Sequence, residues 1–245
     1  MNALPTRHDE AFRYADIDAL ALVWDALGPP ERIEIAAQQT VQQIWLPCDD
    51  AIAVKRVELV VHAGASARIF ALNTARVYAR IEMDVTLHDG AFFELNAANI
   101  GGETSTNEIV TAVRHLEPGG VSRQTIRSVL GDHATGTYLG KVVVAEGAQQ
   151  TDGEQSVKAM LLDRGATANC KPELEIYADD VKCAHGASVG ELDAMQLFYA
   201  MSRGLDPAGA KALLLEGFIG GLWEDLGPDS EIARLASEAL RKVAA

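Results

Sequence analysis

The chain has 245 residues and a mass of 26.2 kDa, and its 21 Lys and Arg against 35 Asp and Glu give a net charge of −14. Such a charge repels phosphate backbones and anionic lipid headgroups, which excludes nucleic-acid binding as the main role. Hydrophobic residues make up 48% of the chain and charged residues 23%, the composition of an ordinary globular protein that needs no disulfide or metal to fold.

The opening residues and the cysteines predict a cytoplasmic protein. Asp9 and Glu10 stand where a secretory signal would have an apolar core. The most apolar stretch, 212–223, contains a glutamate and three glycines and is shorter than the about 20 apolar residues that a membrane span needs. The three cysteines have no C-x-x-C spacing and suit a reducing compartment better than a disulfide framework.

The first part of the chain has the periodicity of a helix. Between Arg7 and Leu27 apolar residues recur at helical spacings, which predicts one helix over 7–27. Gly28-Pro29-Pro30 ends it, because proline cannot continue a helix and restricts the residue before it. Residues 1–31 are therefore interpreted as an N-terminal helical segment.

A run of strands follows, over 32–191. The stretch 76–88 alternates strictly between apolar and polar residues, which predicts a strand with one buried face. The apolar set is Val77, Ala79, Ile81, Met83, Val85 and Leu87, and the polar set is Arg76, Tyr78, Arg80, Glu82, Asp84, Thr86 and His88. Two further strands are predicted at 57–61 and 174–178.

Glycines, most of them followed by alanine, separate these strands at intervals of about 20 to 30 residues. They are Gly64, Gly90, Gly119-Gly120, Gly147, Gly165 and Gly186. Strands between such corners, with no intervening helical pattern, predict a β-solenoid in which each turn buries its inner face against the next. An antiparallel sandwich or barrel remains the alternative, although only Asp89-Gly90 resembles a hairpin turn.

The last zone, 192–245, returns to helices. One helix is expected to end at Gly204, another to begin at Asp206-Pro207, and a third to begin at Asp229. The middle helix has almost no polar face over 212–223, so it is either buried in its own domain or covered by a partner.

Cys183-Ala184-His185 is the most suggestive group for chemistry. Residues i and i+2 of a strand share a face, so the thiol and the imidazole could converge on one metal ion. Two ligands do not close a site, so the others would come from elsewhere, such as another subunit. The structural alternative is a buried cysteine and a corner histidine hydrogen-bonded to backbone.

The adjacent carboxylates of Asp179-Asp180 predict a turn rather than a catalytic pair. The phase of the inward apolar residues slips at these two positions, and a bend explains the slip. The chain has no phosphate-binding glycine loop, no nucleophile elbow and no H-E-x-x-H motif.

Two stretches carry a resemblance to a known family. The block Leu139–Leu205, which contains YADDVKCAHGA and LFYAMSRG, and the opening LPTRHDEAFRYADI are similar to the SufD branch of the SufB/SufD family of iron–sulfur cluster assembly proteins. The SufB branch has an acidic V-E-H-E-A string in place of Val181–Ala187. Family members are often longer before the opening motif, so a short form is expected.

The resemblance implies a right-handed parallel β-helix core with helical ends, and a scaffold subunit that is not an enzyme. It implies pairing through the β-helix with a SufB-like subunit. It also implies that the C-terminal helices bind a SufC-like ATP-binding cassette ATPase near Phe198, Tyr199, Arg203 and Phe218.

The resemblance further implies a site for a transient iron–sulfur cluster at the interface with the SufB-like subunit. His185 is the expected iron ligand, Cys183 is a second candidate, and no stably bound cofactor is expected. Without partners, the same pairing surface predicts a homodimer. The alternative from a different class is a β-solenoid enzyme acting on a polysaccharide, for which the sequence lacks a carboxylate cluster.

Overall fold

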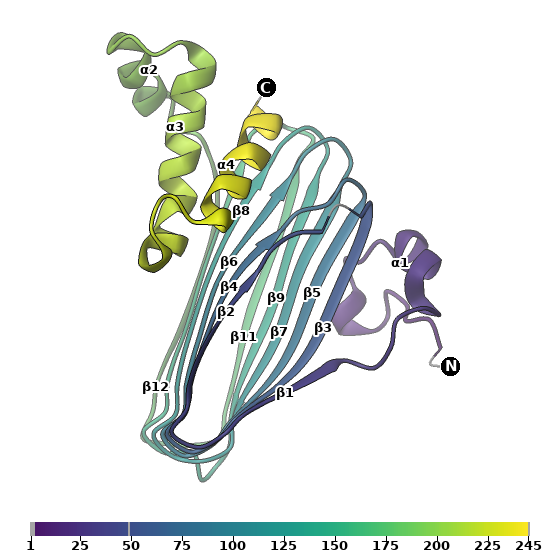
Figure 1. Cartoon of the computed structure of the whole chain (residues 1–245), viewed down its shortest axis with the longest axis vertical. Coiled ribbons are helices and arrows are strands. Elements are labelled where there is room, and N and C mark those ends of the chain that lie inside the picture. The colour runs from purple at the N-terminus through teal and green to yellow at the C-terminus, as the bar shows by residue number, and fades with distance from the viewer. Residues whose placement is uncertain (1–2, 49, 245) are drawn as a thin grey trace.

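The computed structural model describes residues 3–48 and 50–244. Two sheets of six parallel strands face each other, and consecutive strands alternate between them, so the chain forms a β-solenoid of about six turns (Figure 1). The predicted solenoid is confirmed, and the antiparallel sandwich or barrel is wrong. The described residues leave out 1–2, 49 and 245. The outer ends of both predicted terminal segments therefore lie outside the described residues.

Strands with odd numbers form one sheet and strands with even numbers form the other. In sheet order, the first contains β1 (Glu31–Ile35), β3 (Ile52–Val61), β5 (Tyr78–Leu87), β7 (Thr106–His115), β9 (Thr135–Val144) and β11 (Thr167–Ile176). The second contains β2 (Thr40–Trp45), β4 (Ser66–Asn73), β6 (Phe92–Gly101), β8 (Val121–Leu130), β10 (Asp152–Leu161) and β12 (Lys182–Glu191). Strand pairing is in register from turn to turn, so residues at equal positions stack in columns.

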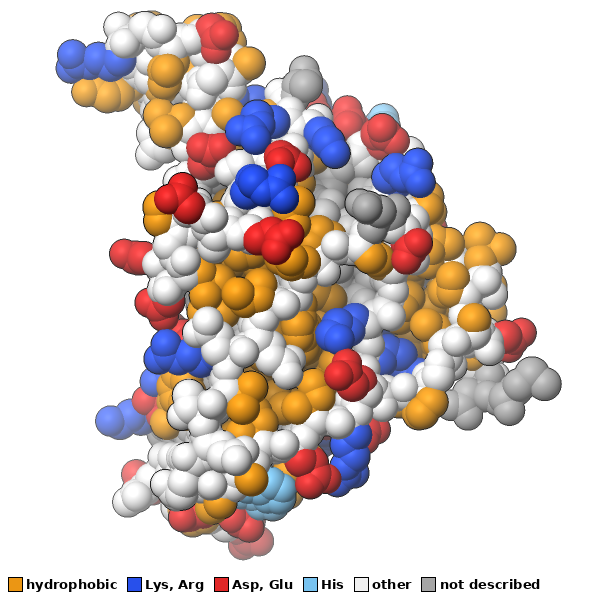
Figure 2. All heavy atoms as spheres, in the orientation of Figure 1, with side chains coloured by type: hydrophobic (Ala, Val, Ile, Leu, Met, Phe, Trp, Pro, Cys, Tyr) orange, Lys and Arg blue, Asp and Glu red, His pale blue; other side chains and the backbone are white. Residues whose placement is uncertain are grey.

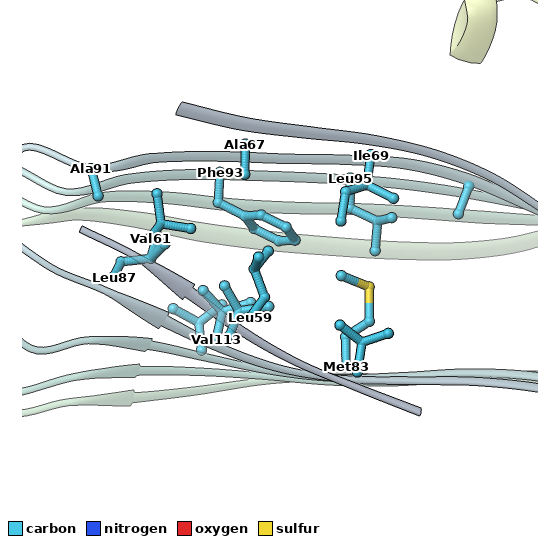
Figure 3. Packing of buried hydrophobic residues seen from close by; sticks show 14 of the residues in the cluster. Leu59, Val61, Ala67, Ile69, Met83, Leu87, Ala91, Phe93, Leu95 and Val113 are labelled. Carbon is cyan, nitrogen blue, oxygen red and sulfur yellow. The ribbon is translucent and has the colours of Figure 1, made fainter. Parts of the chain in front are cut away.

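Apolar side chains fill the space between the sheets in the N-terminal turns. Leu59 and Met83 from one sheet meet Phe93 and Leu95 from the other (Figure 3). Each such side chain contributes about 1.5–3 kcal/mol when fully buried. The inner face predicted within 76–88 is confirmed from Ala79 to Leu87, where every second residue is buried. Val77, the first member of the predicted set, is exposed, because it precedes β5.

Glycine corners stack in three successive turns. Gly64, Gly90 and Gly119 have φ of 63°, 59° and 71°, a left-handed conformation that glycine adopts without strain. Gly165 lies between β10 and β11, at the opposite edge. Gly186 was expected at a corner, but this is wrong, because it lies inside β12 where the pairing with β10 runs on without a break.

The N-terminal segment contains two short helices, η1 (Glu10–Phe12) and α1 (Ile17–Trp24), where one helix was expected. The break occurs because the side chain of Asp16 caps α1, accepting a hydrogen bond from the backbone nitrogen of Ala19 at 3.0 Å. The segment lies beside the outer face of the odd-numbered sheet (Figure 1).

The N-terminal segment covers part of β5, so the prediction that the second face of this strand is exposed is partly wrong. Tyr78 and Arg80 belong to the predicted polar face, but both are buried, because the N-terminal segment packs over them. Glu82, two residues further along, remains partly exposed.

Four helical elements follow the solenoid: α2 (Ala194–Ser202), α3 (Pro207–Gly220), η2 (Gly221–Leu226) and α4 (Glu231–Ala244). Gly204, with φ of 100°, follows α2, and the Asp206 side chain caps α3, as predicted. The third helix begins at Glu231 rather than at Asp229. None of the described helices is long and apolar enough to cross a membrane.

The apolar middle helix is buried mainly within its own domain. Leu215, Ile219 and Trp223 pack, together with α4, over the outer face of the even-numbered sheet, where they cover Phe70 and Ile100. By contrast, α2 projects away from the solenoid at the far end of α3 (Figure 1).

Candidate functional site

The C-terminal end of the solenoid is open. In the described chain, β11 and β12 are the last strands of their sheets, and β12 pairs with β10 alone. Nearly all side chains of β12 are exposed, because no further turn stacks on them. This open end carries the Cys183-Ala184-His185 motif.

Cys183 and His185 lie on the inner side of β12. The strand register pairs Cys183 with Gly153 and His185 with Gln155, and both of these β10 residues are buried. Cys183 is half-buried and packs against the core, whereas His185 is exposed. Within the described chain the His185 side chain makes no hydrogen bond or ion pair.

Glycine at position 153 makes room for the sulfur of Cys183. A Cβ atom built on Gly153 would lie 3.4 Å from Cys183 Sγ. Burial raises the pKa of the Cys183 thiol, and a hydrogen bond from the Gly153 backbone partly opposes this rise. The raised pKa favours the neutral thiol, and a nearby metal ion or cationic group would have to lower it for Cys183 to act as a thiolate.

The open end does not contain a complete metal site. Across residues 3–48 and 50–244, no three His, Cys, Asp or Glu side chains are arranged to hold a metal ion. Tetrahedral sites take four ligands. A cluster bound through Cys183 and His185 would therefore take its remaining ligands from outside this chain.

Asp179 and Asp180 lie in a bend between β11 and β12, and the predicted turn is confirmed. The backbone nitrogen of Asp180 donates to Oε1 of Gln149 at 2.9 Å, and its carbonyl oxygen accepts from the nitrogen of Gln150 at 2.5 Å. The two carboxylates thus belong to a structural bend.

A buried polar column lies directly beneath His185, and the sequence pattern does not predict it. It consists of Thr111, Gln124, Tyr138 and Gln155, all inside the solenoid. Glutamine in a strand is normally assigned to the exposed face. The burial of Gln155 could have been predicted from strand alternation, since it lies two residues from each of the inward residues Gly153 and Val157.

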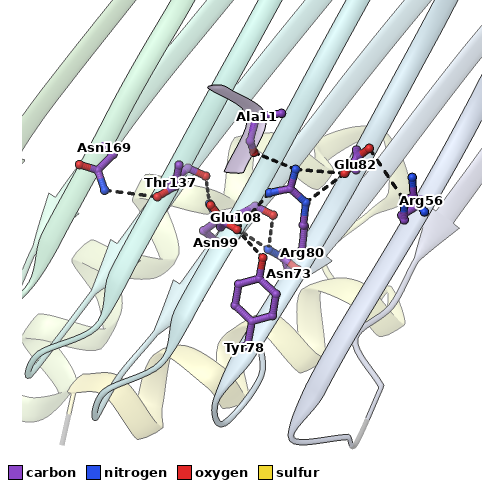
Figure 4. A network of polar contacts seen from close by, with 10 residues as sticks. All are labelled: Ala11, Arg56, Asn73, Tyr78, Arg80, Glu82, Asn99, Glu108, Thr137 and Asn169. Carbon is purple, nitrogen blue, oxygen red and sulfur yellow. Dashed lines mark hydrogen bonds and ion pairs between the residues drawn. The ribbon is translucent and has the colours of Figure 1, made fainter. Parts of the chain in front are cut away.

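A second buried polar network joins the N-terminal segment to the odd-numbered sheet (Figure 4). Arg80 Nη1 lies 3.1 Å from Glu108 Oε2, and the Tyr78 hydroxyl donates to the same carboxylate oxygen at 2.5 Å. Burial raises the pKa values of Glu108 and Tyr78. Arg80 Nη2 also donates to the carbonyl of Ala11 at 2.9 Å, so the network anchors the segment.

Three of the four predicted partner-binding residues lie on α2 or directly after it: Phe198 and Tyr199 belong to the helix, and Arg203 is its C-terminal cap residue. Phe198 and Tyr199 are 65% and 59% exposed, and the guanidinium of Arg203 lies 5.1 Å from the ring centroid of Tyr199. A groove between α2 and α3 is lined by Met195, Tyr199, Leu205 and Leu213, among others. Apolar side chains and a cationic one are visible at this projecting end (Figure 2).

Phe218 does not join this surface. It is half-buried on α3 and packs against the cluster that α3 and α4 form over the even-numbered sheet. The placement follows helix geometry, because Phe218 lies between the buried residues Leu215 and Ile219 and shares their side of the helix.

Comparisons with known proteins identify the family of this chain. The family model for the SufBD core domain of the SUF system of iron–sulfur cluster assembly matches residues 33–218. The iron–sulfur cluster assembly protein SufD of Escherichia coli is 40% identical over 105 residues, which are 43% of this chain and 25% of that protein. A SufBD family protein of Synechocystis is 36% identical over 126 residues, 51% of this chain and 27% of that protein.

SufD of Bacillus subtilis is 29% identical over 155 residues, which are 63% of this chain and 36% of that protein. The matched regions thus span between 25% and 36% of the length of these three curated relatives. Since the family model covers most of the chain, and proteins named SufD are among its relatives, the chain belongs to the SufBD core family of iron–sulfur cluster assembly proteins as a SufD-like member.

Proposed function

We propose that this chain is a scaffold subunit that assembles iron–sulfur clusters together with a SufB-like subunit and a SufC-like ATP-binding cassette ATPase, with no catalytic turnover of its own. One observation carries the proposal: the open end of the solenoid presents an exposed imidazole, His185, on the same strand face as a half-buried thiol, Cys183. In this proposal the cluster is cargo, bound during assembly and then released.

The unpaired edges of β11 and β12 support pairing with a second solenoid. An edge strand exposes backbone N–H and C=O groups that another strand can pair with. A partner at this end would also bring the missing ligands close to His185. Neutral imidazole is a good iron ligand, and a site shared between two subunits can open to release its cluster.

The surface of α2 supports docking of the ATPase. Exposed aromatic residues with a nearby arginine commonly dominate the energy of protein interfaces. Phe198 and Tyr199 are exposed on a helix that projects beyond the solenoid, and Arg203, which caps this helix, lies over the ring of Tyr199. Phe218 contributes indirectly, because its packing against the sheet fixes the position of α3.

Cluster reconstitution with SufB and SufC homologues tests the site. We expect His185→Ala to form the complex with an unchanged melting temperature but to yield at least fivefold less cluster than the wild type. Cys183→Ser should also reduce the yield. His133→Ala removes an exposed imidazole from a corner of the solenoid and serves as the control. Full cluster yield from His185→Ala would show that His185 is not a ligand.

Binding of the ATPase is tested with substitutions on the surface of α2. Truncation before α2 is unsuitable, because α3 and α4 cover apolar residues of the sheet. We expect Phe198→Ser with Tyr199→Ser to weaken binding of the SufC homologue at least tenfold. Leu22→Ser, at a residue 79% exposed on α1, is the control and should bind normally. Unchanged binding by the α2 variant would refute this docking site.

In isolation, two copies are proposed to pair through the same open end. Static light scattering of the purified chain should give the mass of a dimer, and a SufB homologue should convert it to a heterodimer. A monomer at all concentrations would contradict the pairing.

Membership of the SufBD family disfavours the alternative function, a β-solenoid enzyme acting on a polysaccharide.

A further inference from the structure

We propose that Gln155 is a positioning residue for His185: its unpaired side-chain oxygen accepts a hydrogen bond from the imidazole once the exposed ring turns toward it, a bond that the described conformation does not contain. The other ring nitrogen is then free to bind a metal outside the solenoid. This inference rests on the proposed role of His185 as a ligand. It is carried by the hydrogen bonds of the buried polar column, whose direction the geometry determines.

Strand register places the two residues together. Gln155 on β10 and His185 on β12 are direct partners in the parallel pairing, and both face the inside of the solenoid. Neighbouring strands lie about 4.8 Å apart, which is within reach of an amide and an imidazole. Gln155 is only 1% exposed, so its amide must find partners inside the protein.

The column determines which atom of Gln155 is free. Thr111 Oγ1 donates to Gln124 Oε1 at 2.7 Å. The Tyr138 hydroxyl lies 3.1 Å from the same Gln124 oxygen and 3.2 Å from Thr111 Oγ1. Its single hydrogen goes to one of these oxygens, and the phenol oxygen is then left as an acceptor.

Gln155 Nε2 lies 3.0 Å from that phenol oxygen and therefore donates to it. This interaction fixes the orientation of the amide and directs Oε1 away from Tyr138. No group in the described chain donates to Oε1, although it is buried. An unpaired buried acceptor costs about 1–3 kcal/mol, so an N–H donor from the neighbouring His185 would be favourable.

An acceptor beside the ring selects the tautomer. Neutral imidazole carries one N–H and one lone pair, so a ring that donates to Gln155 presents its lone pair on the other nitrogen. Histidines that bind metals usually donate their second N–H in this way, which fixes ring orientation and raises basicity. At the open end, the free nitrogen would then be available to a cluster.

Gly140 keeps the column in place. A Cβ atom at position 140 would lie 2.1 Å from the Tyr138 hydroxyl oxygen, so a larger residue would displace the phenol. Burial also raises the pKa of Tyr138, which keeps its hydrogen for the column.

Nuclear magnetic resonance tests the proposal without any cluster. Long-range ¹H–¹⁵N spectra of the isolated chain at pH 8 report the tautomer ratio of His185. In the wild type we expect a ratio that differs at least threefold from that of an unconstrained histidine. Gln155→Leu should return the ratio to the unconstrained value and should lower cluster yield at least threefold in the reconstituted complex.

A matched control is available at the other end of the solenoid. Gln43 accepts a hydrogen bond from Trp45 Nε1 at 2.8 Å in the first turn, so Gln43→Leu makes the same change far from His185 and should leave its tautomer ratio unaltered. If Gln155→Leu does not fold, Tyr138→Phe replaces it, because loss of the phenol oxygen frees the Gln155 amide to rotate and should also shift the ratio.

A wild-type ratio equal to that of an unconstrained histidine, or one unchanged in both column variants, overturns the positioning role. The proposed function fails on a different result, full cluster yield from His185→Ala, so the two failures are distinguishable.

Discussion

Arg80 and Glu108 form an ion pair in which the side chains are 1% and 0% exposed, with Arg80 Nη1 3.1 Å from Glu108 Oε2. The guanidinium also lies 4.2 Å from the ring centroid of Phe12, which belongs to the N-terminal segment. Because two charges are removed from water here, each depends on the other. The pair therefore couples the N-terminal segment to the solenoid.

Replacement of Arg80 should expose this coupling. In Arg80→Met, Glu108 is left buried without its counter-charge, so we expect a loss of about 3–5 kcal/mol in the free energy of unfolding by urea. The N-terminal segment should also become sensitive to protease. Arg32→Met breaks the exposed pair of Arg32 with Glu34 and should cost less than about 1 kcal/mol. Equal losses in the two variants would contradict this prediction.

His115 should make stability depend on pH. It is fully buried with Nε2 2.9 Å from Ser122 Oγ, and burial lowers its pKa to about 4. The unfolded chain, with a pKa of about 6.5, binds more protons between those two pH values. Stability is therefore complete above pH 6.5 and falls as the pH decreases toward 4, by about 3 kcal/mol in total from this residue.

His115→Gln removes that titration. Urea unfolding at pH 7.5 and pH 4.5 should show that the variant loses less stability than the wild type over this interval, by about 2–3 kcal/mol. The comparison cancels the titration of the carboxylates, which both proteins share. An identical pH dependence for the two proteins would mean that His115 is not responsible.

Gly90 should be sensitive to substitution because of its backbone conformation. Its φ is 59°, and no atom lies near the position of an added Cβ, so Gly90→Ala tests conformation rather than crowding. We expect a loss of about 1–2 kcal/mol in thermal unfolding. Gly147→Ala, also in open space but outside the left-handed region, is the control. An equal loss of stability in Gly147→Ala would contradict this prediction.

Asp206 should stabilise the C-terminal helices as a cap. Its Oδ1 accepts a hydrogen bond from the backbone nitrogen of Gly209 at 2.7 Å, so Asp206→Ala should cost about 0.5–2 kcal/mol by calorimetry. Asp229→Ala removes an exposed carboxylate that precedes α4 without capping it and should change stability by less than about 0.5 kcal/mol. The reverse order of these effects would contradict the assignment.

Features set by neighbouring residues were predictable from the sequence. Alternation from Ala79 to Leu87 predicted an inner face, because strand geometry places every second side chain on one side. Gly64 and Gly90 predicted corners, and Gly204 and Asp206 predicted helix ends, since each depends on local backbone conformation or a local hydrogen bond.

Features set by distant residues were decided only by the tertiary structure. Arg80 is buried because Ala11 and Phe12, almost seventy positions earlier in the chain, pack over it. Gln155 lies beneath His185 because two strands of successive turns pair in one particular register. The sequence by itself thus determined the inner face of β5, the corners at Gly64 and Gly90, the helix ends at Gly204 and Asp206, and the Cys183-Ala184-His185 motif, whereas the corner expected at Gly186 was wrong. The tertiary structure decided which side chains meet across turns, because that depends on strand register and on the segments that cover each sheet, neither of which is encoded in local periodicity.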